Sequence, residues 1–135
     1  MTVTAYIDGL VQPSNPGLGI FAYVIYDGGR RLAEGSGLAG REVTSNYAEY
    51  TALAEALKEL KSLQVKGDVL IRSDSKLLVG QMSEGWKVKG GVYVGKLKEA
   101  RDLMKGFGSI RFEWVPREQN QEADLLTRVE YEKHR

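Results

Sequence analysis

The chain contains no cysteine, and this absence excludes disulfide bonds, thiolate metal sites and cysteine nucleophiles together. Histidine is nearly absent as well, because the only one, His134, is the last residue but one. A Ser-His-Asp triad or a histidine-ligated zinc site in the core is therefore not expected. If the protein is a hydrolase, carboxylates are the groups left to perform the chemistry.

Long apolar segments are also missing. The longest run, Ile20 to Tyr26, is far shorter than the roughly 18–20 residues that cross a bilayer. The first residues lack a basic region and meet an acid at Asp8, which is not typical of a signal peptide. We therefore expect a cytoplasmic protein that does not contact a membrane.

What is present suits one ordinary globular domain. The length of 135 residues is typical of a single domain that buries its own core. The 19 Lys+Arg and 18 Asp+Glu residues leave a net charge of +1, so a basic surface for nucleic acid must be local. We expect a single domain over residues 1–135 that is a monomer in solution, because nothing in the sequence requires a protein partner.

The apolar pattern changes from strand-like to helix-like near Ser45. It predicts strands over Val3–Ile7, Gly19–Tyr26, 30–42, Val69–Ile71 and Ile110–Val115, and helices over 45–63, 77–85, 97–106 and 122–133. The turn-forming sequence Asp27-Gly28-Gly29 predicts a hairpin between the second and third strands. The order βββαβααβα indicates an α/β fold: a five-stranded mixed sheet with helices on both faces.

Four acids have unusual sequence neighbours. Asp8 ends an otherwise apolar strand, and Asp74 follows the strand at 69–71 by three residues. Glu49 and Asp124 lie in the first turns of the first and last predicted helices. Ligands of α/β proteins bind beyond the carboxyl ends of strands. Aspartates that meet there repel one another unless a cation is present, and hard cations such as Mg²⁺ prefer oxygen ligands.

Each acid also has a purely structural interpretation. Asp8 is able to open a loop before Gly9, and the pair Asp74-Ser75 to cap the helix that follows it. Asn46 and Glu49 have the spacing of a capping box. Asp124 is placed to complement a helix dipole. These alternatives stay open at the level of the single residue.

Taken together, the motifs of this chain resemble those of the type 1 ribonuclease H family, over roughly residues 3 to 130. The matching segments are Tyr6-Ile-Asp8-Gly9, Asn15-Pro16-Gly17, Ser45-Asn46-Tyr-Ala-Glu49, Ser73-Asp74-Ser75-Lys76 and the stretch from Trp114 to Asp124. The order of the predicted elements also agrees with the ribonuclease H-like fold.

The resemblance implies that Asp8, Glu49, Asp74 and Asp124 are the catalytic carboxylates and hold two Mg²⁺ or Mn²⁺ ions. It also implies the activity, an endonuclease that hydrolyses the RNA strand of an RNA–DNA hybrid to 3′-hydroxyl and 5′-phosphate ends. In a two-metal mechanism no side-chain nucleophile is needed, which agrees with the missing cysteine and core histidine.

The resemblance further assigns substrate contacts. Asn15, Gly17, Ser45 and Asn46 fall where the family contacts the hybrid backbone. Asn46 is also a short polar group suited to reading a 2′-hydroxyl. Lys76 replaces the glutamine of some members and is expected to hold phosphate.

The chain departs from the family in two places. The loop Pro116–Asn120 is short and lacks the catalytic histidine of many members, so Arg117 or Glu118 is the candidate to assist product release or to act at the scissile phosphate. Asn120 is also assigned to the substrate. The basic protrusion is shortened to Trp86-Lys87-Val88-Lys89, where Trp86, Lys87 and Lys89 are expected to contact the DNA strand.

Three alternatives compete with an active hybrid-specific enzyme. One is a non-catalytic nucleic-acid-binding module on the same fold. Another is a nuclease of this fold that cuts double-stranded RNA or other duplexes. The third is a structural α/β domain whose acids only cap helices.

Overall fold

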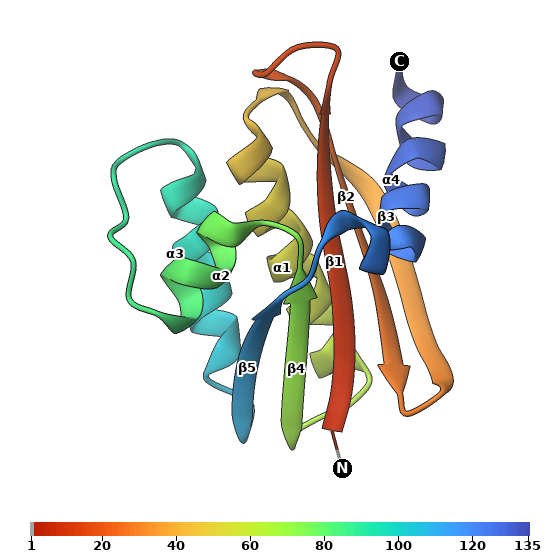
Figure 1. Cartoon of the computed structure of the whole chain (residues 1–135), viewed down its shortest axis with the longest axis vertical. Coiled ribbons are helices and arrows are strands. Elements are labelled where there is room, and N and C mark those ends of the chain that lie inside the picture. The colour runs from red at the N-terminus through yellow and green to blue at the C-terminus, as the bar shows by residue number, and fades with distance from the viewer. Residues whose placement is uncertain (1) are drawn as a thin grey trace.

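The computed structural model describes residues 2–135 and consists of one five-stranded sheet, four α-helices and one short 3₁₀ helix, η1 (Figure 1). The elements are β1 (Thr2–Gln12), β2 (Gly17–Asp27), β3 (Arg30–Val43), α1 (Ser45–Ser62), β4 (Asp68–Ser73), α2 (Lys76–Ser83), α3 (Tyr93–Met104), β5 (Ser109–Trp114), η1 (Arg117–Gln119) and α4 (Gln121–His134). The predicted order of strands and helices is confirmed, and η1 is an addition to it. Among residues 2–135, no helix has both the length and the apolar character needed to cross a membrane.

The sheet is mixed, as predicted. Its strand order is β3-β2-β1-β4-β5. The first three strands form an antiparallel meander through the pairs β1–β2 and β2–β3, whereas β4 and β5 run parallel to β1. The carboxyl ends of β1, β4 and β5 therefore point toward the same end of the molecule, which is the upper half of Figure 1.

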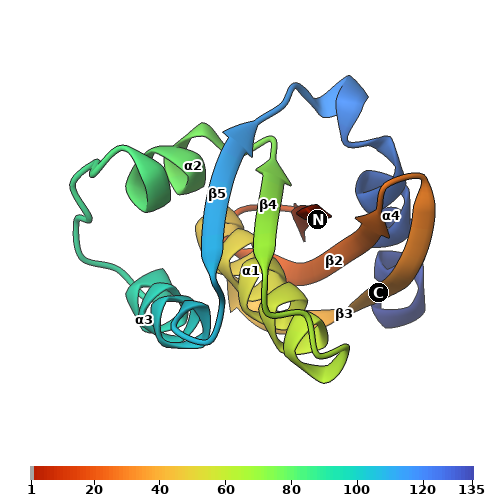
Figure 2. The ribbon, with the colours of Figure 1, turned by 90° about the horizontal axis from the view of Figure 1, so that it is seen from below.

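Helices cover both faces of the sheet, which confirms the predicted layers (Figure 2). α1 packs on one face with α3 beside it, and α4 lies on the other face against β1, β2 and β3. The core between α1 and the sheet includes Ile7, Ile71, Leu53 and Leu57, all fully buried. The strand residues come from alternating positions and the helix residues from one i, i+4 face, so the apolar faces of the strands and of α1 pack against each other.

β1 is longer than the sequence pattern predicted. It continues past Ile7 to Gln12, so Asp8 lies inside a strand and opens no loop. β4 ends at Ser73, which pairs with Ile7, whereas β2 continues to pair with β1 up to Gln12. Asp8 is therefore the first residue of β1 beyond its pairing with β4. At this residue the edge of β1 that faces β4 has no strand partner.

The structure also decides the two capping alternatives. The N-cap of α1 is Thr44, whose hydroxyl accepts a hydrogen bond from the Tyr47 amide at 3.2 Å, so Asn46 forms no capping box with Glu49. The N-cap of α2 is Ser75 rather than Asp74. Hydroxyl side chains satisfy the free amides at both helix starts. The neighbouring carboxylates are consequently not needed for capping.

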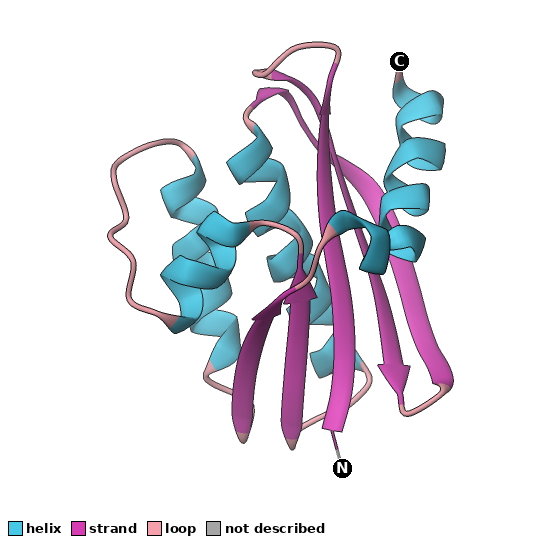
Figure 3. Ribbon diagram, in the orientation of Figure 1, coloured by secondary structure: helices cyan, strands magenta, loops and turns pink. Residues whose placement is uncertain are grey.

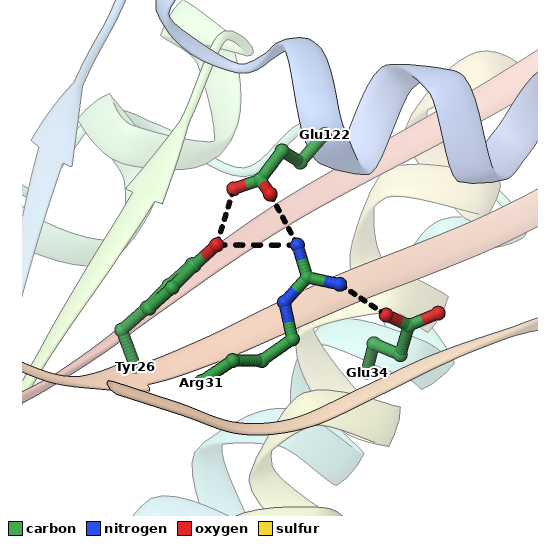
Figure 4. A network of polar contacts seen from close by, with 4 residues as sticks. All are labelled: Tyr26, Arg31, Glu34 and Glu122. Atoms are coloured by element: carbon green, nitrogen blue, oxygen red, sulfur yellow. Dashed lines mark hydrogen bonds and ion pairs between the residues drawn. The ribbon is translucent and has the colours of Figure 1, made fainter. Parts of the chain in front are cut away.

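An exposed polar network fixes the start of α4 (Figure 4). The Tyr26 hydroxyl donates to Glu122 Oε1 at 2.6 Å and accepts from Arg31 Nη2 at 3.2 Å. Arg31 also pairs with Glu34 and Glu122. The network joins the β2–β3 hairpin to the first turn of α4, two residues before Asp124. Exposed pairs of this kind contribute about 1 kcal/mol or less each, so the network orients the helix more than it stabilises the fold.

Candidate metal centre and nucleic-acid interface

Three of the four predicted carboxylates converge on one cleft. Asp8 comes from β1, Glu49 from the first turns of α1, and Asp74 from the residue after β4. One carboxylate oxygen from each lies within 4.8 Å of the others. The cleft has a volume of about 330 Å³, and its lining is completed by Gly9, Ser45, Asn46, Ser75 and Arg117.

Gly9 permits this convergence because it lets β1 approach α1 closely. A Cβ atom at Gly9 would lie 2.6 Å from the Glu49 amide nitrogen and 2.7 Å from the Ala48 carbonyl carbon. Any side chain here would push the strand from the helix and separate Asp8 from Glu49. The Gly9 amide also donates to Asp8 Oδ1 at 3.0 Å, which orients the carboxylate.

Crowding of the acids changes their protonation in the metal-free protein. Burial, followed by the negative charges of Asp74 and Asp124, raises the pKa of Asp8 to about 8. Burial and the charges of Asp8 and Asp74 likewise raise the pKa of Glu49 well above its usual value. Like charges brought together in a poorly solvated site disfavour ionisation. The site therefore favours a cation at neutral pH.

The chemistry of the cleft fits a hard divalent cation. Its donors are carboxylate oxygens, which Mg²⁺ and similar ions prefer. Glu49 Oε1 is buried and has no hydrogen-bond partner within residues 2–135. A buried carboxylate oxygen left without a partner is costly for a protein. The residues of the cleft therefore fit a bound metal ion.

Asp124 lies just outside this group of three. It follows the first turn of α4, and its Oδ2 accepts a hydrogen bond from Arg128 Nε at 3.2 Å. Its charge nevertheless contributes to the raised pKa values of Asp8 and Asp74, which places it beside the cluster. Arg128 pairs with Asp124, which also hydrogen-bonds the Asp8 carboxyl group.

Arg117 supplies a positive charge at the rim of the cleft. It is exposed at the start of η1, and among the described residues it forms no ion pair within 4.0 Å. Burial raises the pKa of Asp74, and the Arg117 guanidinium opposes that rise. The short loop after β5 thus places a cation where it faces the acids and solvent at once.

The turn before β2 is attached to the start of α1. Asn15 Nδ2 donates to Ser45 Oγ at 3.0 Å, and the Ser45 amide donates to Asn15 Oδ1 at 3.1 Å. Gly17 begins β2 directly after this turn. Asn46 follows Ser45 on the cleft lining. Two of the residues that the sequence assigned to the substrate, Ser45 and Asn46, therefore line the carboxylate cleft, and Asn15 is bonded to one of them.

A second hollow of about 220 Å³ lies beside α2. Lys76, Trp86 and Trp114 line it together with Val79 and Glu84. Lys76 Nζ lies 4.9 Å from the centre of the Trp114 ring, whose Nε1 donates to the Asp74 carbonyl at 3.2 Å.

Trp114 was not among the predicted site residues. It ends β5 and opens the Trp-Val-Pro motif, and it pairs directly with Ser73 of β4, the residue before Asp74. A large indole side chain at the exposed end of a strand beside a predicted site was reason to include it.

Of the remaining predicted residues, the two lysines lie apart from the cleft lining, whereas Asn120 lies beside Asp74: burial raises the pKa of Asp74, and a side-chain hydrogen bond with Asn120 opposes that rise. Lys87 and Lys89 are exposed in the segment after α2. Asn120 is only 1% exposed, and its Nδ2 donates to the Ile7 carbonyl at 2.8 Å. This hydrogen bond joins β1 to the start of α4. The predicted contact of Asn120 with the substrate stays a prediction, and the burial of the side chain argues against it.

Comparison with known proteins places this chain in a family. Residues 7–129 match the family model described as reverse transcriptase-like. The chain is 36% identical over 125 residues to the ribonuclease HI of Halobacterium salinarum, covering 92% of this chain and 61% of that protein. The chain belongs to the type 1 ribonuclease H family. The crystal structure of RNase H1 from the same archaeon has 33% sequence identity to it and superposes with a TM-score of 0.90, covering 98% of this chain and 99% of that one.

Two further ribonuclease H proteins have the same fold. The N-terminal RNase H domain of Rv2228c from Mycobacterium tuberculosis has 34% identity and a TM-score of 0.90, covering 98% of this chain and 94% of that chain. LC11-RNase H1, isolated from compost, was solved in complex with an RNA/DNA hybrid; it has 33% identity and a TM-score of 0.90, with 97% of each chain covered. The five-stranded mixed sheet is thus the ribonuclease H fold.

The curated relatives are longer than this ribonuclease H chain. It spans 61% of the Halobacterium protein and 31% of the bifunctional Mycobacterium protein Rv2228c. The shared part contains the carboxylate cleft, since the family model covers residues 7–129.

Proposed function

We propose that this protein is a metal-dependent endoribonuclease that cleaves the RNA strand of RNA–DNA hybrids. The observation that carries the proposal is the convergence of Asp8, Glu49 and Asp74 on one cleft, with one oxygen from each within 4.8 Å of the others. The hybrid bound to the related LC11-RNase H1 supports the substrate class.

The carboxylates would act as metal ligands. Asp8, Glu49 and Asp74 would hold a divalent cation, Mg²⁺ or Mn²⁺, and Asp124 beside them would complete the site for a second ion. When bound, the ions supply an activated water and stabilise charge on the leaving 3′-oxygen, which gives 3′-hydroxyl and 5′-phosphate products. The protein needs no nucleophile of its own, and its lack of cysteine agrees with this.

The rim of the cleft would select and hold the RNA strand. Ser45 and Asn46 present short polar groups and helix N-terminal amides beside Glu49. Groups of this size are able to reach a 2′-hydroxyl across the minor groove of a hybrid. The mutual hydrogen bonds of Asn15 and Ser45 would keep the turn in register with α1, so that strand selection is coupled to the position of Glu49.

Arg117 would take the place of the loop histidine that many family members carry. Its guanidinium lies at the rim of the cleft and acts on the pKa values of both Glu49 and Asp74. A guanidinium forms paired hydrogen bonds with phosphate and does not titrate near neutral pH. We assign Arg117 to holding the scissile or released phosphate and not to proton transfer.

The DNA strand would be held on the other side of α2. Trp86 and Lys76 line the aromatic hollow there, and Lys87 and Lys89 are exposed next to it. Cationic groups bind phosphates, and an indole ring packs against a sugar or a base. Because few cations are involved, binding should be modest and strongly dependent on salt.

A substrate panel tests the proposal. The protein would be incubated with an RNA–DNA hybrid, double-stranded RNA, duplex DNA, and duplex DNA containing one ribonucleotide, each with Mg²⁺ or with EDTA. We expect cleavage of the hybrid in Mg²⁺ and none in EDTA. Hybrid binding without cleavage in Mg²⁺ or Mn²⁺ would support a non-catalytic module, preferred cutting of double-stranded RNA would change the substrate class, and cutting of plain duplex DNA or activity in EDTA would refute the proposal.

A further inference from the structure

The segment 84–92, between α2 and α3, contains no helix or strand, yet it carries Trp86, Lys87 and Lys89 (Figure 3). Its role in gripping nucleic acid rests on the proposed function. A cationic segment without regular structure loses conformational entropy when it binds, unless something holds it in advance. The contacts beneath the segment therefore determine how well it presents its lysines.

Trp86 is the first anchor of the segment. Its ring packs directly on α2 at Gly80, where a Cβ atom would lie 2.1 Å from the indole. The Trp86 amide also donates to the Gly80 carbonyl at 3.1 Å. Only glycine leaves room for the ring on the helix backbone at this point, so the segment leaves α2 along a defined path.

Gln81 is the second anchor, and it is buried. The residue is only 3% exposed. Gln81 Nε2 donates to the Lys87 carbonyl at 3.3 Å and to the Tyr93 hydroxyl at 3.1 Å. The Tyr93 hydroxyl in turn donates to the Lys89 carbonyl at 3.3 Å. The backbone carbonyls of both lysines are therefore fixed by one buried polar chain.

The same chain reaches α1. The Tyr50 hydroxyl donates to Gln81 Oε1 at 2.6 Å, and Tyr50 directly follows Glu49 in α1. The rings of Tyr50 and Tyr93 are stacked, with centroids 5.6 Å apart and an interplanar angle of 21°. Both amide hydrogens of Gln81 and its carbonyl oxygen are thus used, and a buried polar group satisfied in this way is held in a single orientation.

We propose that Gln81 is a positioning residue for nucleic-acid binding: with Tyr50 and Tyr93 it holds segment 84–92 in register with α1, so that Lys87 and Lys89 face the hybrid bound at the carboxylate cleft. Val88, between the two lysines, packs against the core. The two lysines themselves are exposed on either side of it. The glutamine thus acts on substrate affinity through backbone carbonyls and touches no substrate itself.

Two variants separate this role from general stabilisation. Gln81→Met keeps a similar volume but removes every hydrogen bond of the amide. Tyr93→Phe keeps the stack on Tyr50 and removes only the hydroxyl. Ser83→Ala is the matched control, because Ser83 is exposed on α2 and its hydroxyl bonds only to the Val79 carbonyl of its own helix. Urea unfolding of each variant gives the folded fraction, and Tyr93→Phe decides the test if Gln81→Met does not fold.

Binding of a labelled RNA–DNA hybrid in EDTA and steady-state cleavage in Mg²⁺ would be measured over a range of salt concentrations. For Gln81→Met and Tyr93→Phe we expect affinity to fall and KM to rise about five- to tenfold, since a hydrogen bond contributes about 1 kcal/mol, with kcat within about twofold of the wild type. The slope of log affinity against log salt should become shallower by about one, as for one lost phosphate contact. Ser83→Ala should match the wild type.

A double-mutant cycle with Lys87→Ala completes the test. If Gln81 acts through Lys87, the loss of affinity caused by Lys87→Ala should be at least threefold smaller in the Gln81→Met background than in the wild type. Full additivity, or an unchanged KM in both variants of a folded protein that cuts the hybrid, would overturn this inference and leave the proposed function intact. A wild-type protein that neither binds nor cuts the hybrid would overturn the proposed function, and this inference with it.

Discussion

The carboxylate cleft and segment 84–92 are joined by α2 but are built in opposite ways. In the cleft, Asp8 lies in a strand, Glu49 in a helix, and Asp74 directly after a strand. The segment has no regular backbone, and buried side chains hold it from below. Regular elements place the groups proposed for chemistry, whereas one glutamine and two tyrosines place the groups proposed for binding. Damage to the first region should therefore affect turnover, and damage to the second should affect affinity.

The largest effect should come from Asp8→Asn. Replacing a metal ligand removes several kcal/mol of transition-state stabilisation, so kcat should fall about a thousandfold or more, measured with a labelled hybrid in Mg²⁺. Asp102→Asn on α3 is the matched control, because that acid is exposed and pairs only with Lys105. If Asp8→Asn were to keep near-normal kcat, the cleft would not be the site of chemistry.

A smaller loss of turnover should follow Arg117→Ala. The substitution removes the cation that faces Glu49 and Asp74, and loss of one charged group at a transition state lowers kcat by about ten- to a hundredfold. Arg117→Lys should recover part of the loss, and Arg111→Ala, on an exposed position of β5, should have no effect. An unchanged kcat in Arg117→Ala would remove this residue from the mechanism.

The affinity for the hybrid that segment 84–92 contributes should depend on salt concentration and not on the metal ion. Lys87→Ala combined with Lys89→Ala should lower affinity for the hybrid about tenfold at low salt, and the difference should shrink as salt rises, because released counterions drive this contact. Fluorescence anisotropy in EDTA measures it. Lys66→Ala, an exposed lysine between α1 and β4, is the charge-matched control. A loss of affinity that stays constant across salt concentrations would mean that these lysines do not contact phosphates.

The smallest effect concerns stability in the metal-free protein. The pKa of Asp8 is raised to about 8, whereas an aspartate in an unfolded chain titrates near pH 4. The folded protein therefore retains a proton that the unfolded chain releases, so the stability contributed by this group is present below about pH 4 and is lost as pH rises through about 8.

Urea unfolding in EDTA at pH 5 and pH 9 checks this expectation. The urea midpoint of the wild type should be lower at pH 9 than at pH 5. Asp8→Asn should reduce this difference between the two pH values, because it raises the free energy of unfolding at pH 9 by about 1–2 kcal/mol. Saturating Mg²⁺ should also reduce the difference, because a ligand that binds only the folded state stabilises it. A midpoint that is equal or higher at pH 9 in the wild type would show that neither burial nor the neighbouring acids hold a proton on Asp8 in the folded protein.

Sequence patterns sufficed for the elements of the fold because they are amphipathic. The strand at 3–7 and the helix face containing Leu53 and Leu57 follow the periods of 2 and 3.6 residues, and burial in the structure agrees with both. The extension of β1 to Gln12 was missed because it depends on pairing with β2, a contact between distant parts of the chain. The cap at Thr44 was missed for a local reason, because side chains that can cap a helix stand side by side from Thr44 to Asn46. For α2 the sequence offered the pair Asp74-Ser75, and the structure selects the hydroxyl of Ser75.

The same contrast holds for the site. Asp8, Glu49 and Asp74 could be grouped because their motifs resemble one family, and the structure brings them together. The role of Gln81 could not be found in this way. Its neighbours Leu77, Leu78 and Met82 predict a buried helix face, and Gln81 fits that face as one more position. A polar residue among apolar ones at helical spacing was the available signal, and only the folded chain gives it partners in α1, α3 and segment 84–92.

The chemistry of the cleaved ends tests the central claim most directly. An RNA–DNA hybrid labelled on either end of its RNA strand would be digested in Mg²⁺, and the products would be tested for 5′-phosphate, 3′-hydroxyl and cyclic phosphate ends. The account predicts internal cuts in the RNA strand only, with 5′-phosphate and 3′-hydroxyl ends and no reaction in EDTA. Cyclic phosphate ends, or cutting that persists in EDTA, would contradict it, because the carboxylate cleft would then not direct a metal-activated water to the phosphate.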